Sequence, residues 1–127
     1  MPTVTVTAES LDKTITENEI VLRDFWADWC GPCKQFARVF EKSSEDNTDV
    51  VYGKIDTEDQ QQLAAAAQIT SIPTLMAFKN GVPVFRQAGS LPAPALADLV
   101  AQLKALDVEA AMKAQAEADA AATTPGE

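Results

Sequence analysis

Histidine is absent from the 127-residue chain, and cysteine occurs only twice. These scarcities restrict the metal sites that the chain can form, because a structural zinc site needs about four protein ligands and a catalytic one about three. Only carboxylates could complete a site around two thiolates, and they are a poor match for that ligand set. Covalent haem attachment requires a histidine directly after the second cysteine, whereas Lys34 stands there. We therefore expect no metal and no haem.

The chain also lacks long apolar runs and an excess of positive charge. No stretch approaches the roughly 20 apolar residues of a membrane-spanning helix, and the N-terminus has no basic region followed by an apolar one, as a secretory signal would. The net charge of −9 disfavours nucleic acid or an anionic membrane surface as a partner. We expect a cytoplasmic protein, since two cysteines with no other pairing suit a reducing compartment.

Both cysteines fall in one pentapeptide, Trp29-Cys30-Gly31-Pro32-Cys33. A Cys-x-x-Cys pair near an alternating strand and helix pattern is the sequence sign of a redox site. As a structural cross-link the pair would be weak, because a disulfide that encloses so few residues removes almost no chain entropy. The motif therefore predicts thiol–disulfide exchange.

The residues around the pentapeptide place it between a strand and a helix. Residues 20–26 are apolar except for Arg23 and Asp24, which predicts a central strand. Pro32 suits the first turn of a helix, where its missing N–H costs nothing. An apolar stripe at helical spacing follows, formed by Cys33, Phe36, Ala37 and Phe40. We therefore expect Cys30 to lie exposed at the helix N-terminus and Cys33 to face the interior.

The rest of the chain alternates strands and helices. Asn80-Gly81 is its strongest hairpin signal, and Pro83, which cannot donate to a strand ladder, marks the strand after the turn as an edge strand. The further strands are expected at residues 3–7, 50–56, 74–78 and 82–85, and the further helices at 9–19, at 58–67 and after Pro92 and Pro94. This order predicts a three-layer α/β domain over residues 1–106.

Residues 107–127 differ from the rest of the chain. They are rich in alanine, with scattered charges and little to bury beyond Val108 and Met112. Alanine favours helix, but a helix without an apolar face gains little from packing. We predict a solvated helical extension that frays and a disordered tail at 123–127. A docking or regulatory arm is the alternative interpretation.

Four motifs, in this order, resemble the thioredoxin family over residues 1–106. They are Asp24-Phe25-Trp26-Ala27-Asp28-Trp29-Cys30-Gly31-Pro32-Cys33-Lys34, Ser71-Ile72-Pro73-Thr74, Phe78-Lys79-Asn80-Gly81 and Ala88-Gly89. The alanine-rich extension is similar to that of actinobacterial thioredoxins. The resemblance implies the thioredoxin fold, a three-layer α/β/α arrangement whose central five-stranded mixed sheet has the strand order 1-3-2-4-5 and is flanked by four helices, two on each face.

The resemblance also implies a function, that of a protein-disulfide reductase that exchanges its dithiol with substrate disulfides. The protein would bind no cofactor itself, and a flavoprotein thioredoxin reductase would regenerate the dithiol with electrons from NADPH. We expect a monomer whose partners are this reductase and disulfide-containing proteins such as peroxiredoxin or ribonucleotide reductase. Two alternatives stay open: a reductant dedicated to one substrate, and a non-catalytic module that holds a partner on the same surface.

The two cysteines have different expected roles. A helix N-terminus favours a thiolate, so Cys30 should attack the substrate disulfide and Cys33 should then resolve the mixed disulfide. No histidine can take the proton of Cys33, which leaves Asp24, a lone carboxylate in an apolar strand, as the candidate base; burial would raise its pKa. A pair between Asp24 and Arg23, or an early end of the strand, is the alternative, although strand alternation sends the two side chains to opposite faces.

The resemblance extends to a substrate surface. Pro73 matches the family's cis-proline, whose loop faces the cysteines and offers its backbone to a substrate strand. A shallow apolar surface would be framed by Trp29, Gly31, Pro32, Ile72, Pro73, Ala88, Gly89 and Ser90, with Trp26 packed beneath. Many relatives carry, at the position matched to Tyr52, a lysine that pairs with the buried carboxylate. We expect Asp24 to lack this lysine, and the Tyr52 hydroxyl could hydrogen-bond it instead.

Overall fold

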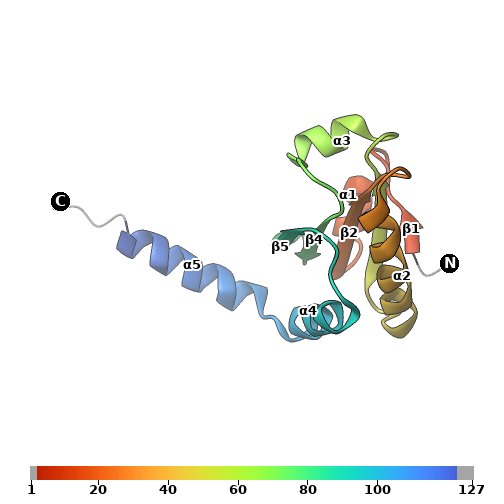
Figure 1. The fold of residues 1–127 in the computed structure, drawn as a ribbon. Coiled ribbons are helices and arrows are strands. Elements are labelled where there is room, and N and C mark those ends of the chain that lie inside the picture. Colours follow the sequence, from red (N-terminus) through yellow and green to blue (C-terminus); the bar gives the residue numbers. More distant parts are fainter. Residues whose placement is uncertain (1–2, 123–127) are drawn as a thin grey trace.

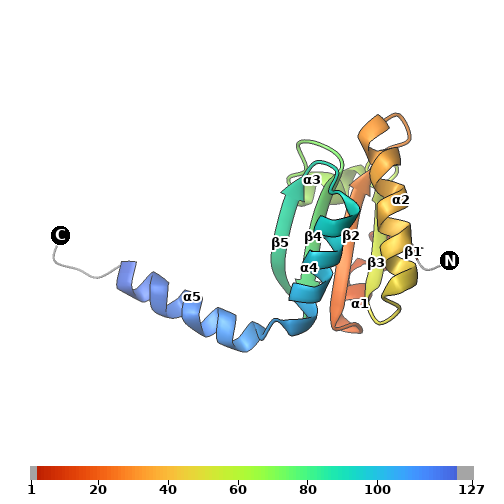
Figure 2. The ribbon, with the colours of Figure 1, turned by 60° about the horizontal axis from the view of Figure 1, so that its bottom comes forward.

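The computed structural model describes residues 3–122, and within them lies one five-stranded sheet (Figures 1 and 2). Its strands are β1 (Thr3–Thr5), β2 (Ile20–Trp26), β3 (Val51–Asp56), β4 (Thr74–Lys79) and β5 (Val82–Ala88). They lie in the order β1-β3-β2-β4-β5. β3 runs parallel to β1 and β2, whereas β4 is antiparallel to β2 and β5. The predicted mixed sheet and its strand order are therefore confirmed.

Helices cover both faces of the sheet. The described residues form α1 (Leu11–Thr16), α2 (Gly31–Asp46), α3 (Gln61–Ala66), α4 (Ala93–Ala105) and α5 (Val108–Ala122). α2 and α4 pack on one face, α1 and α3 on the other, which gives the three expected layers (Figure 2). The resemblance implied four helices, and the described residues contain five, because the alanine-rich segment forms a helix that points away from the sheet (Figures 1 and 2).

β2 lies in the middle of the sheet, and both of its faces are buried. Because side chains alternate along a strand, Leu22 and Asp24 face α2 and α4, whereas Arg23 and Phe25 face α1 and α3. The larger apolar cluster includes Leu22, Phe36, Phe40, Tyr52, Leu96 and Val100. The smaller one joins Val6, Phe25 and Ile55. Neighbouring residues of β2 therefore enter two different cores.

Asn80 and Gly81 form the predicted hairpin turn between β4 and β5. Their φ values are 53° and 80°, as a two-residue turn of type I′ requires. Pro83 lies in β5, the last strand of the described sheet, so its missing N–H faces an unpaired edge as expected. β5 continues beyond its expected end and brings Ala88 opposite the first residue of β4.

α1 and α3 are shorter than the sequence pattern predicted. Before α3, the carboxylate of Asp56 accepts the backbone N–H of Glu58 (2.9 Å), a local turn that competes with helix formation. α3 consequently begins at Gln61. At the end of α1, the side-chain amide of Asn18 donates to the carbonyl O of Thr14 (2.9 Å) and closes the helix early.

The segment after α4 forms a helix with exposed side chains. Val108 is buried, and every residue from 109 to 121 is exposed. The disordered tail expected at residues 123–127 lies outside the described residues.

Candidate active site

α2 begins at the cysteine motif. Cys30 is the N-cap residue of α2, and its Sγ accepts a hydrogen bond from the backbone N–H of Cys33 (3.1 Å). Pro32 lies in the first turn of the helix, as predicted. Cys30 and Cys33 form a disulfide, with Cα atoms 5.2 Å apart. The pair therefore lies at a helix N-terminus, whose dipole favours negative charge on a sulfur atom.

Both cysteines are buried, so the expectation that Cys30 lies exposed is wrong. Cys30 is 4% exposed and Cys33 2%. The loop before β4 covers Cys30, and the carbonyl O of Ile72 lies 3.7 Å from its Sγ. The periodicity of α2 could not reveal this cover, because it comes from a segment 42 residues further along the chain. The neighbouring Trp29, by contrast, is 70% exposed.

Two loops meet beside the disulfide. The Ile72–Pro73 peptide bond is cis, as the resemblance implied. The carbonyl O of Pro73 accepts a hydrogen bond from the N–H of Gly89 (2.7 Å). Gly89 has a φ of 98°, a conformation that glycine adopts without steric cost. The end of β5 is thereby fixed against the cis-proline loop.

The expected surface residues differ in their exposure. Trp29, Gly31, Pro32, Ala88 and Gly89 are exposed, Ile72 and Ser90 are half-buried, and Pro73 is buried. A hollow of about 310 Å³ borders Trp29 and Ile72, and its wall also includes Thr57, Ala64, Ile69, Thr70 and Ser71. These additional wall residues were not predicted. They are small or β-branched residues of α3 and nearby loops, and all but Ser71 lie outside the family motifs.

Asp24 is completely buried, and neither of its carboxylate oxygens has a hydrogen-bond partner among the described residues. Loss of hydration raises its pKa to about 7, an effect that the positive charge of Lys54 partly offsets. The guanidinium of Arg23 lies on the opposite face of the sheet, 4.2 Å from the centroid of the Phe78 ring. The structure therefore does not bring Arg23 and Asp24 together.

Lys54, and not Tyr52, is the residue of β3 opposite Asp24. Lys54 and Asp24 are partners in the parallel β2–β3 ladder. The hydroxyl of Tyr52 and Oγ of Ser43 lie 2.6 Å apart, and Nζ of Lys54 lies 4.9 Å from the centroid of the Trp26 ring. The expected bond from Tyr52 to Asp24 and the expected absence of a facing lysine are both wrong. Alternate strand residues share a face, so the sequence pattern alone did not distinguish the two positions.

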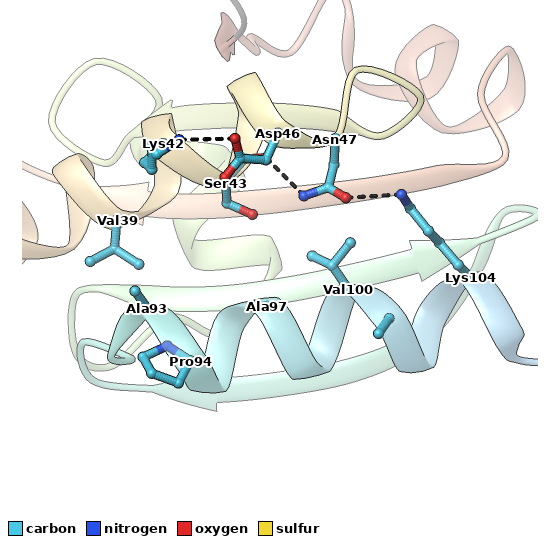
Figure 3. A pocket seen from close by; sticks show the side chains of 11 residues that line it. Val39, Lys42, Ser43, Asp46, Asn47, Ala93, Pro94, Ala97, Val100 and Lys104 are labelled. Atoms are coloured by element: carbon cyan, nitrogen blue, oxygen red, sulfur yellow. Dashed lines mark hydrogen bonds and ion pairs between the residues drawn. The ribbon is translucent and has the colours of Figure 1, made fainter.

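A second hollow, of about 530 Å³, lies between α2 and α4 (Figure 3). The small side chains of Ala93, Ala97 and Ala101 line the α4 side, and a hydrogen bond from Lys104 to Asn47 (2.9 Å) joins the two sides. Its lining contains neither cysteine. The disulfide end of α2, and not this hollow, is therefore the candidate active site.

Residues 3–122 contain neither a cluster of metal ligands nor a membrane-spanning helix. In this range no group of three or more His, Cys, Asp or Glu side chains is placed to hold a metal ion. None of the helices described here is long and apolar enough to cross a membrane.

The chain is similar to known thioredoxins in sequence and in structure. The family described as thioredoxin matches residues 2–102. A Streptomyces coelicolor protein named putative thioredoxin 2 is 54% identical over 120 residues, which cover 94% of this chain and 90% of that protein. The thioredoxin of Mycoplasma genitalium is 37% identical over 91 residues, covering 72% of this chain and 89% of its own.

The solved structures agree. A mutant thioredoxin from Halobacterium salinarum superposes with a TM-score of 0.77 at 36% identity, covering 84% of this chain and 95% of that one. These matches and the Cys30–Cys33 disulfide at the start of α2 have one consistent interpretation. The chain belongs to the thioredoxin family of protein-disulfide oxidoreductases, and Cys30–Cys33 is its redox-active disulfide.

Proposed function

We propose that Cys30 is the attacking cysteine and Cys33 the resolving one. The thiolate of Cys30 attacks one sulfur of a substrate disulfide, which forms a mixed disulfide and releases the other substrate sulfur as a thiolate. The thiolate of Cys33 then attacks Sγ of Cys30 and releases the second substrate thiolate. Two electrons pass to the substrate, and Cys30–Cys33 is left oxidised.

The observation that best supports these roles is the position of Cys30 as the N-cap residue of α2. Its Sγ already accepts the backbone N–H of Cys33 at 3.1 Å, and this donor, together with the helix dipole, stabilises negative charge there. Cys33 lies within the buried stripe of α2 with Phe36 and Phe40. Because Cys30 and Cys33 are only three positions apart, the second attack is intramolecular. The effective concentration of the Cys33 thiolate near Sγ of Cys30 is therefore high.

We infer that Asp24 accepts the proton of Cys33. Three observations support this role: Asp24 is buried, its carboxylate has no hydrogen-bond partner among the described residues, and its pKa is about 7. A base with a pKa near the working pH takes up and returns a proton most effectively. Lys54, opposite Asp24 in the sheet, would stabilise the ionised form.

The substrate surface is proposed to consist of Trp29, Gly31, Pro32, Ile72, Pro73, Ala88, Gly89 and Ser90. The hydrogen bond between Gly89 and Pro73 supports this grouping, since it holds both loops next to the disulfide. Exposed Trp29 supplies an apolar contact beside a buried redox pair. A substrate chain would lie across Pro73 as an added strand.

The partners follow from the chemistry of the family. Thioredoxins in general exchange electrons with reductases and with disulfide substrates. We propose that a thioredoxin reductase supplied by NADPH reduces Cys30–Cys33, and that proteins such as peroxiredoxin or ribonucleotide reductase oxidise it. We also propose a monomer in the cytoplasm, because a reduced dithiol needs a reducing compartment to persist.

We propose that residues 1–106 form the catalytic domain and residues 107–127 an extension. The family match ends at residue 102, inside α4. The Streptomyces match covers 94% of the chain and so continues into α5. The extension is therefore shared with a relative although it lies outside the family core.

Insulin reduction with dithiothreitol as the electron source tests the proposed roles. The wild-type protein should accelerate the reduction, and Cys30→Ser should abolish the acceleration because the attacking thiolate is gone. A non-catalytic binding module would instead hold its partner equally well after both cysteines are replaced. Full activity of Cys30→Ser would contradict the mechanism.

A further inference from the structure

Arg86 of edge strand β5 reaches across the sheet to the end of α3. Its Nη1 donates to the carbonyl O of Ala67 (2.6 Å), and its Nη2 donates to the carbonyl O of Gln68 (2.7 Å). Arg86 lies opposite Met76 in the β4–β5 ladder, so the side chain extends over the neighbouring strand to make these bonds. A planar guanidinium fork suits two adjacent acceptors, because both N–H groups point the same way.

The two carbonyls that Arg86 binds lie on either side of a left-handed residue. Gln68 has a φ of 57°. The N–H of Ile69 donates to Ala64 O (2.9 Å) and that of Gln68 to Ala65 O (3.0 Å), the pattern of a Schellman helix end. That position is usually glycine, and a side chain there is disfavoured. Arg86 therefore stabilises a helix end that its own sequence supports poorly.

The chain after this helix end leads directly into the active site. Residues 69–72 of this loop line the hollow beside Trp29, and the carbonyl O of Ile72 lies 3.7 Å from Cys30 Sγ. At its far end, the carbonyl O of Pro73 accepts the N–H of Gly89 (2.7 Å). β5 and the residue after it thus bind the loop at both ends, through Arg86 and Gly89.

We propose that Arg86 is a positioning residue that fixes the 67–73 loop for protein substrates. It does not touch the disulfide; it acts through the loop that carries Ile72 and Pro73. This inference rests on the proposed substrate surface. Loss of the two Arg86 hydrogen bonds would loosen the start of the loop, so a protein substrate would have to order the loop on binding. A small disulfide that contacts only the cysteines would not need an ordered loop, and its rate would not change.

The test compares Arg86→Met with Arg38→Met. Arg38 is an exposed arginine of α2, on the opposite face of the sheet, so its replacement removes the same charge away from the loop. For the reduced proteins, the rate constants with insulin and with the small reagent dithiobis(nitrobenzoate) would be measured. Arg86→Met should lower the insulin rate about fivefold, as loss of a charged hydrogen-bond pair permits. The small-reagent rate should stay unchanged, and Arg38→Met should alter neither.

Hydrogen exchange supplies a second readout. In Arg86→Met, the amides of Gln68 and Ile69 should exchange about tenfold faster than in the wild type, and those of β2 should not change. Arg86→Lys should give intermediate values, since an ammonium is a point donor and cannot match the fork.

Three outcomes would overturn the inference. If the amides of Gln68 and Ile69 exchanged in Arg86→Met at the same rate as in the wild type, the Arg86 hydrogen bonds would not hold the loop. This conclusion would not depend on the proposed substrate surface. Equal losses in the insulin and small-reagent rates would show a general destabilisation. Faster exchange with an unchanged insulin rate would also overturn it, and Ile72→Asp then tells the two proposals apart. If Ile72→Asp lowers the insulin rate, the substrate surface stands and Arg86 alone is misassigned; if it does not, the surface itself is wrong.

Discussion

The packed body of residues 3–106 and the helix α5 are held in shape by different forces. In the body, β2 is buried on both faces and carries a carboxylate, Asp24, into the core. In α5, residues 109 to 121 are all exposed, so backbone hydrogen bonds and the helix propensity of alanine maintain the helix. A group can be kept in an energetically unfavourable environment only when tight packing around it holds it there. The body can therefore keep Asp24 in its costly position, and α5 could not.

The largest effect should come from removing the buried charge of the body. The pKa of Asp24 is about 7 in the folded protein against an ordinary 3.8. A raised pKa means that the folded protein favours the protonated form of Asp24. The contribution of this group to the free energy of unfolding is therefore complete below about pH 4 and is lost as the pH rises to about 7. The loss is on the order of 4 kcal/mol. Asp24→Asn should therefore be more stable than the wild type at pH 8, and should lack this pH dependence.

Urea unfolding at pH 4.5, 7 and 8.5 measures this effect, with the neighbouring exposed Asp28→Asn as the control. The same Asp24→Asn protein should reduce insulin at least about tenfold more slowly at neutral pH, because the proton acceptor is gone. If the free energies of unfolding of Asp24→Asn and the wild type changed with pH in parallel, burial of the Asp24 carboxylate would not be costly. Unchanged insulin turnover would refute the role of Asp24 as a base.

A smaller effect is expected at the junction between the body and α5. Lys79 is 4% exposed, and its Nζ donates to the carbonyl O atoms of Leu103 (2.6 Å), Lys104 (3.2 Å) and Leu106 (2.6 Å). These carbonyls lie at the end of α4, where a helix lacks enough N–H donors of its own; that of Leu103 also accepts the N–H of Leu106 (3.3 Å). Lys79→Met should lower the free energy of unfolding by about 2 kcal/mol, because these carbonyls lose a charged donor.

Thermal and urea unfolding would detect this loss. Lys42→Met is the control, because Lys42 is exposed and its ion pair with Asp46 lies on the surface; it should change stability by no more than about 0.5 kcal/mol. Equal stabilities of Lys79→Met and Lys42→Met would show that the buried ammonium does not hold the end of α4.

The smallest effect on the body should come from α5 itself. Ala114→Gly should weaken the local helix by about 1 kcal/mol and reduce its far-ultraviolet circular dichroism signal. Unfolding of the body should shift by less than about 0.5 kcal/mol, since residue 114 is exposed. The same substitution at Ala77, which is buried in β4, should destabilise the body clearly. If Ala114→Gly and Ala77→Gly behaved alike, α5 would have to pack on the body.

The features that the sequence predicted are those encoded locally. The strand at β2, the hairpin at Asn80-Gly81 and the helix start at Pro32 depend on neighbouring residues and agree with the structure. The burial of Asp24 followed from its place as the lone carboxylate of an apolar strand. The cis bond before Pro73 could be expected only from the family motif, because most proline bonds are trans.

The features that were missed depend on pairs distant in sequence. The cover of Cys30 by Ile72 joins segments far apart, and the register that places Lys54 opposite Asp24 is set by two strands together. Arg86 gave no signal either, because a charged residue on an edge strand is ordinary. Periodicity describes one element at a time, so it cannot reveal what another segment places against it.

Trapping on Cys33→Ser tests the central claim, that Cys30 attacks and Cys33 resolves. The reduced variant would be mixed with a disulfide-containing protein, and the covalent product would be mapped by mass spectrometry under non-reducing conditions. The account predicts a persistent mixed disulfide through Cys30, and no such product from Cys30→Ser. An adduct at Cys33 in Cys30→Ser, with none at Cys30 in Cys33→Ser, would contradict it.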